Sequence, residues 1–138
     1  MNQAFVADSS VGIAWIHPSQ ATDWTRRLLT LAKEGTAVHV TGIWHLEIAN
    51  ALIVAVRRKL MTDAHRQIGL GLLGGLRLVV DTETSGLAFS RTSDLAAKYS
   101  LSAYDAAYLE LAQRKSIPLA SRDEPLKAAA KRAGIKVL

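Results

Sequence analysis

Short runs of apolar and β-branched residues alternate along the chain with longer segments in which apolar residues recur every three to four positions. The short runs predict buried β-strands, and the longer segments predict amphipathic helices. Strands are expected at residues 4–7, 37–41, 78–80, 117–120 and 135–138. Helices are expected at residues 11–16, 23–34, 44–60, 62–73, 87–99, 102–115 and 124–133.

This alternation predicts an α/β fold. Strand–helix–strand crossovers are right-handed and pair strands in parallel, so we expect a three-layer α/β/α domain around a mainly parallel sheet of four to five strands. The helix at 44–60 is apolar almost all round until Arg57 and should be buried. No repeat, low-complexity run or linker interrupts the pattern, so residues 1–138 are expected to form one domain.

Serines precede the helix expected at 11–16, and glycines occur near the end of the helix expected at 62–73. Ser9 and Ser10 are expected to cap the helix at 11–16. Residues 69–74 match the G-x-G-x-x-G pattern of dinucleotide-binding loops, but there the pattern follows a strand and opens a helix. Here a helical stretch precedes it and a strand follows it, so we interpret it as a glycine-loosened helix end.

Composition removes several classes of chemistry. The chain has no Cys, which excludes disulfide scaffolds, thiolate zinc sites and cysteine nucleophiles. The four histidines lack metal-binding spacing, and neither a G-x-S-x-G elbow nor a P-loop motif occurs. The chain start lacks the basic and apolar segments of a signal peptide, and no apolar run is long enough for a membrane span. We therefore expect a cytoplasmic protein without a membrane partner.

The chain is basic. It has 17 Lys and Arg against 12 Asp and Glu, a net charge of +5. A basic folded surface suits a polyanion, of which nucleic acid is the commonest, although it is also compatible with an ordinary basic protein.

Four of the acids stand where a solvated side chain is not expected, namely Asp8, Glu47, Asp105 and Asp123. Three of them have a local explanation: Asp8 as a strand-end turn residue, Asp105 in a capping box with Ser102, and Asp123 as a helix N-cap. Glu47, inside the most apolar helix, has none.

Taken together, the four acids point to one rim of the sheet. Asp8 and Asp123 follow parallel strands, the helix of Glu47 begins at the same rim, and Asp105 lies in the first turn of a helix. Carboxylates 4 Å apart repel by on the order of 4 kcal/mol at an effective dielectric of 20, so protonation or a divalent cation must relieve them. Oxygen donors without thiolate or paired imidazole favour Mg²⁺, with Mn²⁺ as the alternative.

At these residues the sequence resembles the PIN-domain ribonucleases, and closely the VapC toxins of bacterial toxin–antitoxin pairs. The resemblance covers essentially the whole chain. Its landmarks are Val6-Ala7-Asp8-Ser9-Ser10, Glu47-Ile48-Ala49-Asn50-Ala51-Leu52, residues 101–112 with Tyr104-Asp105-Ala106-Ala107, and Ala120-Ser121-Arg122-Asp123.

The resemblance implies a sheet ordered 3-2-1-4-5 with Mg²⁺ at its centre. It assigns Asp8 and Asp105 as metal ligands, Asp123 as completing the metal environment, and Glu47 as a base or acceptor for water. Asn50 and Ser121 would support the carboxylates. It also implies endonucleolytic cleavage of RNA, often tRNA, inhibition by a cognate antitoxin protein, and a homodimer.

Two other interpretations remain open at this point. In a phosphoacceptor receiver domain, Asp81 after the strand at 78–80 would be the acceptor, although a strand-end turn also explains it. A PIN-like module that binds RNA or protein without cutting would be favoured by the loss of one acid, and none is missing.

Overall fold

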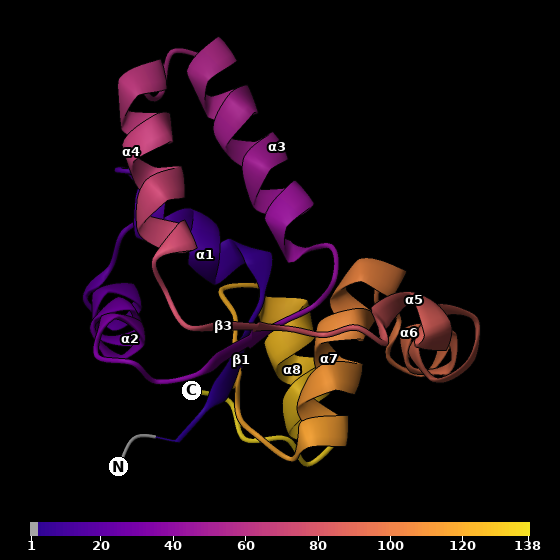
Figure 1. The fold of residues 1–138 in the computed structure, drawn as a ribbon. Coiled ribbons are helices and arrows are strands. Elements are labelled where there is room, and N and C mark those ends of the chain that lie inside the picture. Colours follow the sequence, from indigo (N-terminus) through magenta and orange to yellow (C-terminus); the bar gives the residue numbers. More distant parts are fainter. Residues whose placement is uncertain (1–2) are drawn as a thin grey trace.

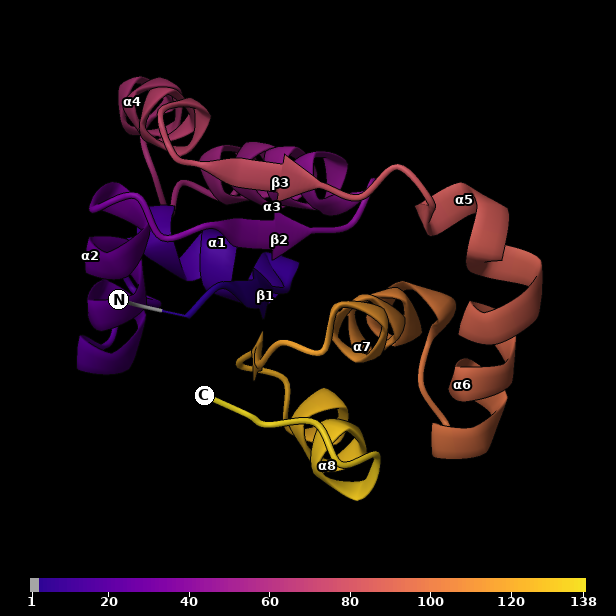
Figure 2. The ribbon, with the colours of Figure 1, turned by 60° about the horizontal axis from the view of Figure 1, so that its bottom comes forward.

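The computed structural model describes residues 3–138, and its elements are arranged as in Figures 1 and 2. One parallel sheet has the strand order β3-β2-β1-β4. Its strands are β1 (Phe5–Ala7), β2 (Val38–Val40), β3 (Leu78–Val80) and β4 (Leu119–Ala120). The predicted order is therefore confirmed for these strands. Residues 135–138 lie beside β4 as expected, but form a single parallel bridge between Leu119 and Val137 instead of a full strand.

Helices cover both faces of this sheet. They are α1 (Ser9–Ile16), α2 (Asp23–Lys33), α3 (Trp44–Arg57), α4 (Asp63–Gly74), α5 (Thr84–Leu87), the π-helix η1 (Ala88–Thr92), α6 (Ser93–Tyr99), α7 (Ala103–Lys115) and α8 (Glu124–Arg132). Helices α1, α3 and α4 lie on one side of the sheet, and α7 and α8 lie on the other (Figure 1). This is the predicted three-layer α/β fold. The chain runs along the sheet from β1 through β2 to β3 and then returns to β4 on the other side of β1. Because the crossovers are right-handed, helices that connect strands in opposite directions along the sheet lie on opposite faces.

The central strand β1 is completely buried, with Phe5, Val6 and Ala7 all inaccessible to solvent. Helix packing on one side depends on two glycines. A Cβ at Gly12 would collide with Ile48 of α3, and one at Gly69 would collide with Ile16 of α1. Residues 69–74 form the C-terminal half of α4, which ends at Gly74, so the prediction of a helix end there is confirmed, and Gly69 in addition allows close contact between helices.

Three other details differ from prediction. Helix α1 begins at Ser9 and is capped by Asp8, whose carboxylate accepts from the backbone N of Val11, so Ser9 and Ser10 are not the cap. Helix α3 is buried along one face only, and Leu46 is 73% exposed. The helix expected at 87–99 begins at Thr84 and contains the π-helical turn, which periodicity over so few residues does not reveal. Of the helices within residues 3–138, none has the length and apolarity of a membrane span.

Candidate active site

The four acids singled out in the sequence lie at the N-terminal ends of four helices. Asp8 caps α1 and Asp123 caps α8, while Glu47 and Asp105 stand in the first turns of α3 and α7. Helices that follow parallel strands begin at the same rim of the sheet. Backbone N–H groups and the positive ends of the helix dipoles favour negative charge there.

Asp8 is the most enclosed of the four. Only 2% of the residue is exposed, and its carboxylate accepts hydrogen bonds from the hydroxyls of Ser10 (2.6 Å) and Ser121 (2.5 Å) and from the backbone N of Val11 (3.3 Å). Burial raises the pKa of Asp8 to about 6, the charge of Asp105 adds to this rise, and the hydrogen bonds oppose it. A buried carboxylate with a raised pKa lacks compensating positive charge.

Glu47 is held by a residue that sequence reasoning missed. The hydroxyl of Tyr108, a fully buried side chain of α7, donates a 2.5 Å hydrogen bond to Oε1 of Glu47. Burial raises the pKa of Glu47 and the Tyr108 hydrogen bond lowers it, while burial followed by the contact with Glu47 raises the pKa of Tyr108. The available signal was a tyrosine among the mostly apolar residues 106–112, because a buried hydroxyl needs a polar partner.

Asp105 links the other acids electrostatically. Its negative charge raises the pKa of both Asp8 and Glu47, and the pKa of Asp105 is itself raised by burial and then by the charge of Asp123. The hydroxyl of Ser102 accepts from the backbone N of Asp105 at 3.1 Å and caps α7. The structure therefore brings all four acids into one electrostatic cluster, in which Asp105 is the common neighbour.

The loop between β4 and α8 forms hydrogen bonds with two of the four acids, Asp8 and Asp123. Ser121, completely buried, donates to Asp8 and accepts from the backbone N of Asp123 at 2.9 Å. The backbone N of Arg122 donates to the hydroxyl of Ser10, which in turn donates to Asp8. Asp123 also caps α8 by accepting from the backbone N of Leu126 at 2.9 Å. Ser121 thus lies where its predicted supporting role requires.

Asn50 is placed differently. It is exposed on α3, and among residues 3–138 its side chain forms no hydrogen bond with the four acids. The structure therefore does not join Asn50 to the carboxylate cluster.

The donor chemistry of the cluster fits a hard divalent cation. Carboxylate and hydroxyl oxygens surround a region where three acids have raised pKa values, which is the environment that Mg²⁺ or Mn²⁺ would stabilise. Over the part of the chain that is described, no three His, Asp or Glu side chains already converge closely enough to hold a metal ion. Their oxygens instead accept hydrogen bonds from Ser10, Ser121 and Tyr108, so ion binding would draw the acids closer together.

Asp81 occupies a separate, closed site. Arg114 of α7 binds both of its carboxylate oxygens at 3.1 and 2.9 Å, and the hydroxyl of Thr84 donates to it at 2.9 Å. Burial alone would raise the pKa of Asp81, but these hydrogen bonds hold it below its usual value. Arg114 also pairs with Glu83 and Glu110. A carboxylate enclosed in this way is poorly placed to accept a phosphoryl group, which disfavours the receiver-domain interpretation.

Comparison with solved structures identifies several similar folds. PAE2754 from Pyrobaculum aerophilum matches with a TM-score of 0.71 at 19% identity, over 98% of this chain and 83% of that one. VapBC2 from Rickettsia felis, bound to a promoter DNA fragment, matches at 0.65 and 13% identity, over 99% and 98%. FitAcB from Neisseria gonorrhoeae matches at 0.62 and 20% identity, over 97% and 96%. At these identities the likeness concerns the fold alone.

Comparison of the sequence itself is more specific for the family. No curated protein matches the chain significantly. The family model described as PIN domain matches residues 5–132, which includes all four acids and nearly the whole chain. The chain therefore belongs to the PIN-domain family.

Proposed function

We propose that this protein is a metal-dependent endoribonuclease that hydrolyses RNA phosphodiester bonds. The observation that carries the proposal is the cluster of Asp8, Glu47, Asp105 and Asp123 on one rim of the sheet, with Asp105 coupled to the other three. Membership of the PIN-domain family, whose members are generally nucleases, and the net charge of +5 support it.

Asp8 and Asp105 would hold Mg²⁺, or Mn²⁺, and Asp123 would complete the metal environment. When bound, the ion would neutralise the carboxylates and stabilise the negative charge that develops on the phosphodiester. Ser121 and Ser10 would fix the orientation of Asp8, whose two carboxylate oxygens they hold separately.

Glu47 would accept the proton of the attacking water. Its pKa is raised above the usual value, which makes it a better base than an exposed carboxylate. Tyr108 would fix the direction of the Glu47 side chain by donating to Oε1.

The test is incubation of the purified protein with total small RNA in Mg²⁺, in Mn²⁺ and in EDTA. Cleavage into discrete fragments is expected with either ion and none in EDTA. Equal cleavage in EDTA would exclude a metal-dependent reaction. Intact RNA under all three conditions, from a protein shown to be folded by circular dichroism, would favour the non-catalytic binding module instead.

We further propose that the enzyme is the toxin of a toxin–antitoxin pair, forms a homodimer and acts in the cytoplasm. The structurally similar VapBC2 and FitAB complexes support this role. An arginine of an antitoxin segment would bridge two of the clustered carboxylates by forked hydrogen bonds and so compete with the metal. Expression of the chain alone should slow growth, and its partner should restore growth. Asp105→Asn should be harmless on its own, and growth inhibition by that variant equal to the parent would contradict the toxin role.

A further inference from the structure

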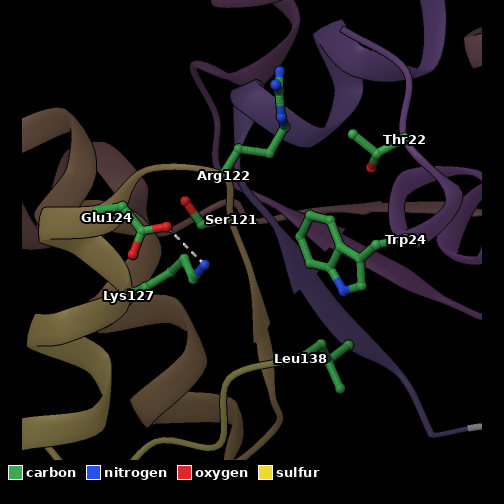
Figure 3. A pocket seen from close by; sticks show the side chains of 7 residues that line it. All are labelled: Thr22, Trp24, Ser121, Arg122, Glu124, Lys127 and Leu138. Atoms are coloured by element: carbon green, nitrogen blue, oxygen red, sulfur yellow. Dashed lines mark hydrogen bonds and ion pairs between the residues drawn. The ribbon is translucent and has the colours of Figure 1, made fainter.

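A hollow of about 430 Å³ opens beside Ser121, the residue that donates a hydrogen bond to Asp8 of the carboxylate cluster. One wall comes from the start of α2 with Thr22 and Trp24, and the other from the β4–α8 loop and α8. Figure 3 shows the indole of Trp24 facing Lys127 across the hollow, with Ser121 above Lys127 and the Arg122 side chain extending upward from the same loop. Its volume lies within the usual range of small-molecule sites.

Hydrogen bonds connect the lining of the hollow to Asp8. Ser121 lines the hollow and donates to Asp8, and the backbone N of Arg122 donates to the Ser10 hydroxyl that binds the other oxygen of Asp8. A group bound in the hollow would therefore sit at a fixed position relative to Asp8. Such a fixed offset is what a nuclease needs to recognise a nucleotide next to the bond that it cuts.

The lining combines an aromatic face with a guanidinium. The other two tryptophans are core residues, with Trp15 and Trp44 only 9% and 1% exposed, whereas Trp24 is half-buried. Among residues 3–138, the guanidinium of the exposed Arg122 has one hydrogen bond, to Gln20 at 2.9 Å, and no carboxylate partner. Lys127 is paired with Glu124 at 3.0 Å, so of the two lining cations Arg122 is the one without an ionic partner in this part of the chain, and it can meet a phosphate.

A second hollow also borders Trp24. It is lined mainly by side chains of α2, including the apolar Leu28 and Leu31 and the cation Arg27. Both hollows therefore place a cation near the indole, which is the usual way in which proteins hold single-stranded nucleic acid. The first differs from the second in including Ser121, whose hydroxyl donates to Asp8.

We propose that this hollow binds one nucleotide of the RNA substrate adjacent to the cleaved bond, with the base stacked on Trp24 and its phosphate on Arg122. This inference rests on the proposed ribonuclease function and deepens it by naming a single-stranded, stacking subsite. Trp24 would be a binding residue that selects an unpaired base at a fixed distance from the cut, because the face of a base within a duplex is already covered by its stacked neighbours.

The test measures binding without cleavage. A short single-stranded oligoribonucleotide is titrated into the full chain in EDTA at low salt, and tryptophan fluorescence is followed together with the anisotropy of a dye on the RNA. Quenching is expected on binding, because the stacked base contacts the one tryptophan outside the core. The same oligonucleotide with abasic sugars should bind roughly five- to a hundred-fold more weakly and quench little.

Variants separate stacking from loss of fold. Trp24→Ala should weaken binding of the ordinary oligonucleotide to the level of the abasic one, while Trp24→Phe should retain most of the affinity and lose the quenching. Phe89→Ala is the matched control, because Phe89 is fully exposed and lies on η1 between α5 and α6, far from α2 (Figure 2). Its affinity should equal that of the parent.

Equal binding of the ordinary and abasic oligonucleotides by the unchanged protein would overturn the stacking subsite, as would unchanged affinity in folded Trp24→Ala. These outcomes are independent of the cleavage assay. RNA cleavage with no effect of base removal on binding would reject the subsite and keep the ribonuclease, whereas stacking without cleavage in Mg²⁺ would reject the ribonuclease and its cleavage subsite and leave only a base-stacking RNA site.

Discussion

The hydroxyl of Ser121 donates a 2.5 Å hydrogen bond to Oδ2 of Asp8, joining residues 113 positions apart in the sequence. Asp8 follows β1 and Ser121 follows β4, and these strands are neighbours in the parallel sheet. The bond therefore connects the carboxyl ends of two adjacent strands. Ser121 also accepts from the backbone N of Asp123. A substitution at any of these three residues should therefore alter the positions of the other two.

Asp8→Asn should stabilise the metal-free protein at neutral pH. Burial raises the pKa of Asp8 from 3.8 in the unfolded chain to about 6 in the folded one, so the ionised carboxylate opposes folding. Asparagine caps a helix as well as aspartate and carries no charge. The gain in free energy of unfolding should be on the order of 2 kcal/mol at pH 7.

The pH dependence of the stability difference between Asp8→Asn and the parent tests whether the carboxylate charge causes it. The folded-state pKa is raised, so the parent loses stability as the pH rises from about 4 through 6, and the difference between variant and parent should grow over that interval. Well below pH 3.8 the carboxyl is neutral in both the folded and the unfolded chain, and the two stabilities should converge. Urea unfolding in EDTA across this range makes the measurement, and a difference that does not vary with pH would mean that the carboxylate charge is not responsible.

Tyr108→Phe should impair cleavage through Glu47. Removal of the hydroxyl deletes a hydrogen bond that lowers the pKa of Glu47, so that pKa should rise and the acidic limb of the pH–rate profile should move to higher pH. We expect kcat to fall by roughly ten-fold near neutral pH, with KM little changed. A lower rate with an unshifted profile would assign Tyr108 to packing alone.

Arg114→Leu should destabilise the fold strongly. Arg114 is 14% exposed and binds Asp81 and Glu110, whose side chains are 5% and 2% exposed. Removal of the guanidinium leaves buried carboxylates unpaired, at a loss of about 3 kcal/mol. The control is Arg26→Leu, which breaks an exposed pair with Asp23 and should change stability by less than about 1 kcal/mol. Equal effects of the two substitutions in denaturant unfolding would refute a structural role for the buried pair.

RNA binding should weaken steeply with salt, because phosphate contacts release counterions. Arg122→Gln should lower affinity and reduce the slope of log K against log salt by about one, since Arg122 is exposed next to Asp123. Lys33→Gln, on the last turn of α2, should change both less. Anisotropy titrations at several salt concentrations compare the three proteins, and affinity that does not respond to salt would argue against a nucleic-acid substrate.

Much of the fold and of the cluster could be predicted because local pattern and topology act together. Asp8 and Asp123 follow strand-like runs, and parallel strands bring their carboxyl ends to one rim, so spacing alone placed them together. Glu47 was recognisable as an acid in an apolar helix. Its hydrogen bond with Tyr108 was not, because that contact depends on how α3 and α7 lie relative to the sheet.

Other features depend on contacts that no single segment encodes. The exposed face of α3 and the close approach of Gly69 to Ile16 follow from helix packing across the sheet face. Asp81 was visible as a strand-end acid, but its enclosure by Arg114 joins residues 33 positions apart. The final strand was placed correctly and its length overestimated, since the apolar residues 135–138 do not report how many ladder bonds form.

Cleavage of small RNA in Mg²⁺ by Asp105→Asn, compared with the parent and with Asp94→Asn, tests the central claim most directly. Asp94 is the matched control. Like Asp105 in α7, it is an aspartate in the first turn of its helix, α6, but its side chain is exposed and lies outside the cluster. We predict a loss on the order of a hundred-fold or more for Asp105→Asn, since Asp105 is the common neighbour of the other three acids, with the parental rate for Asp94→Asn. Cleavage by folded Asp105→Asn at the parental rate would contradict the assignment of the reaction to this cluster.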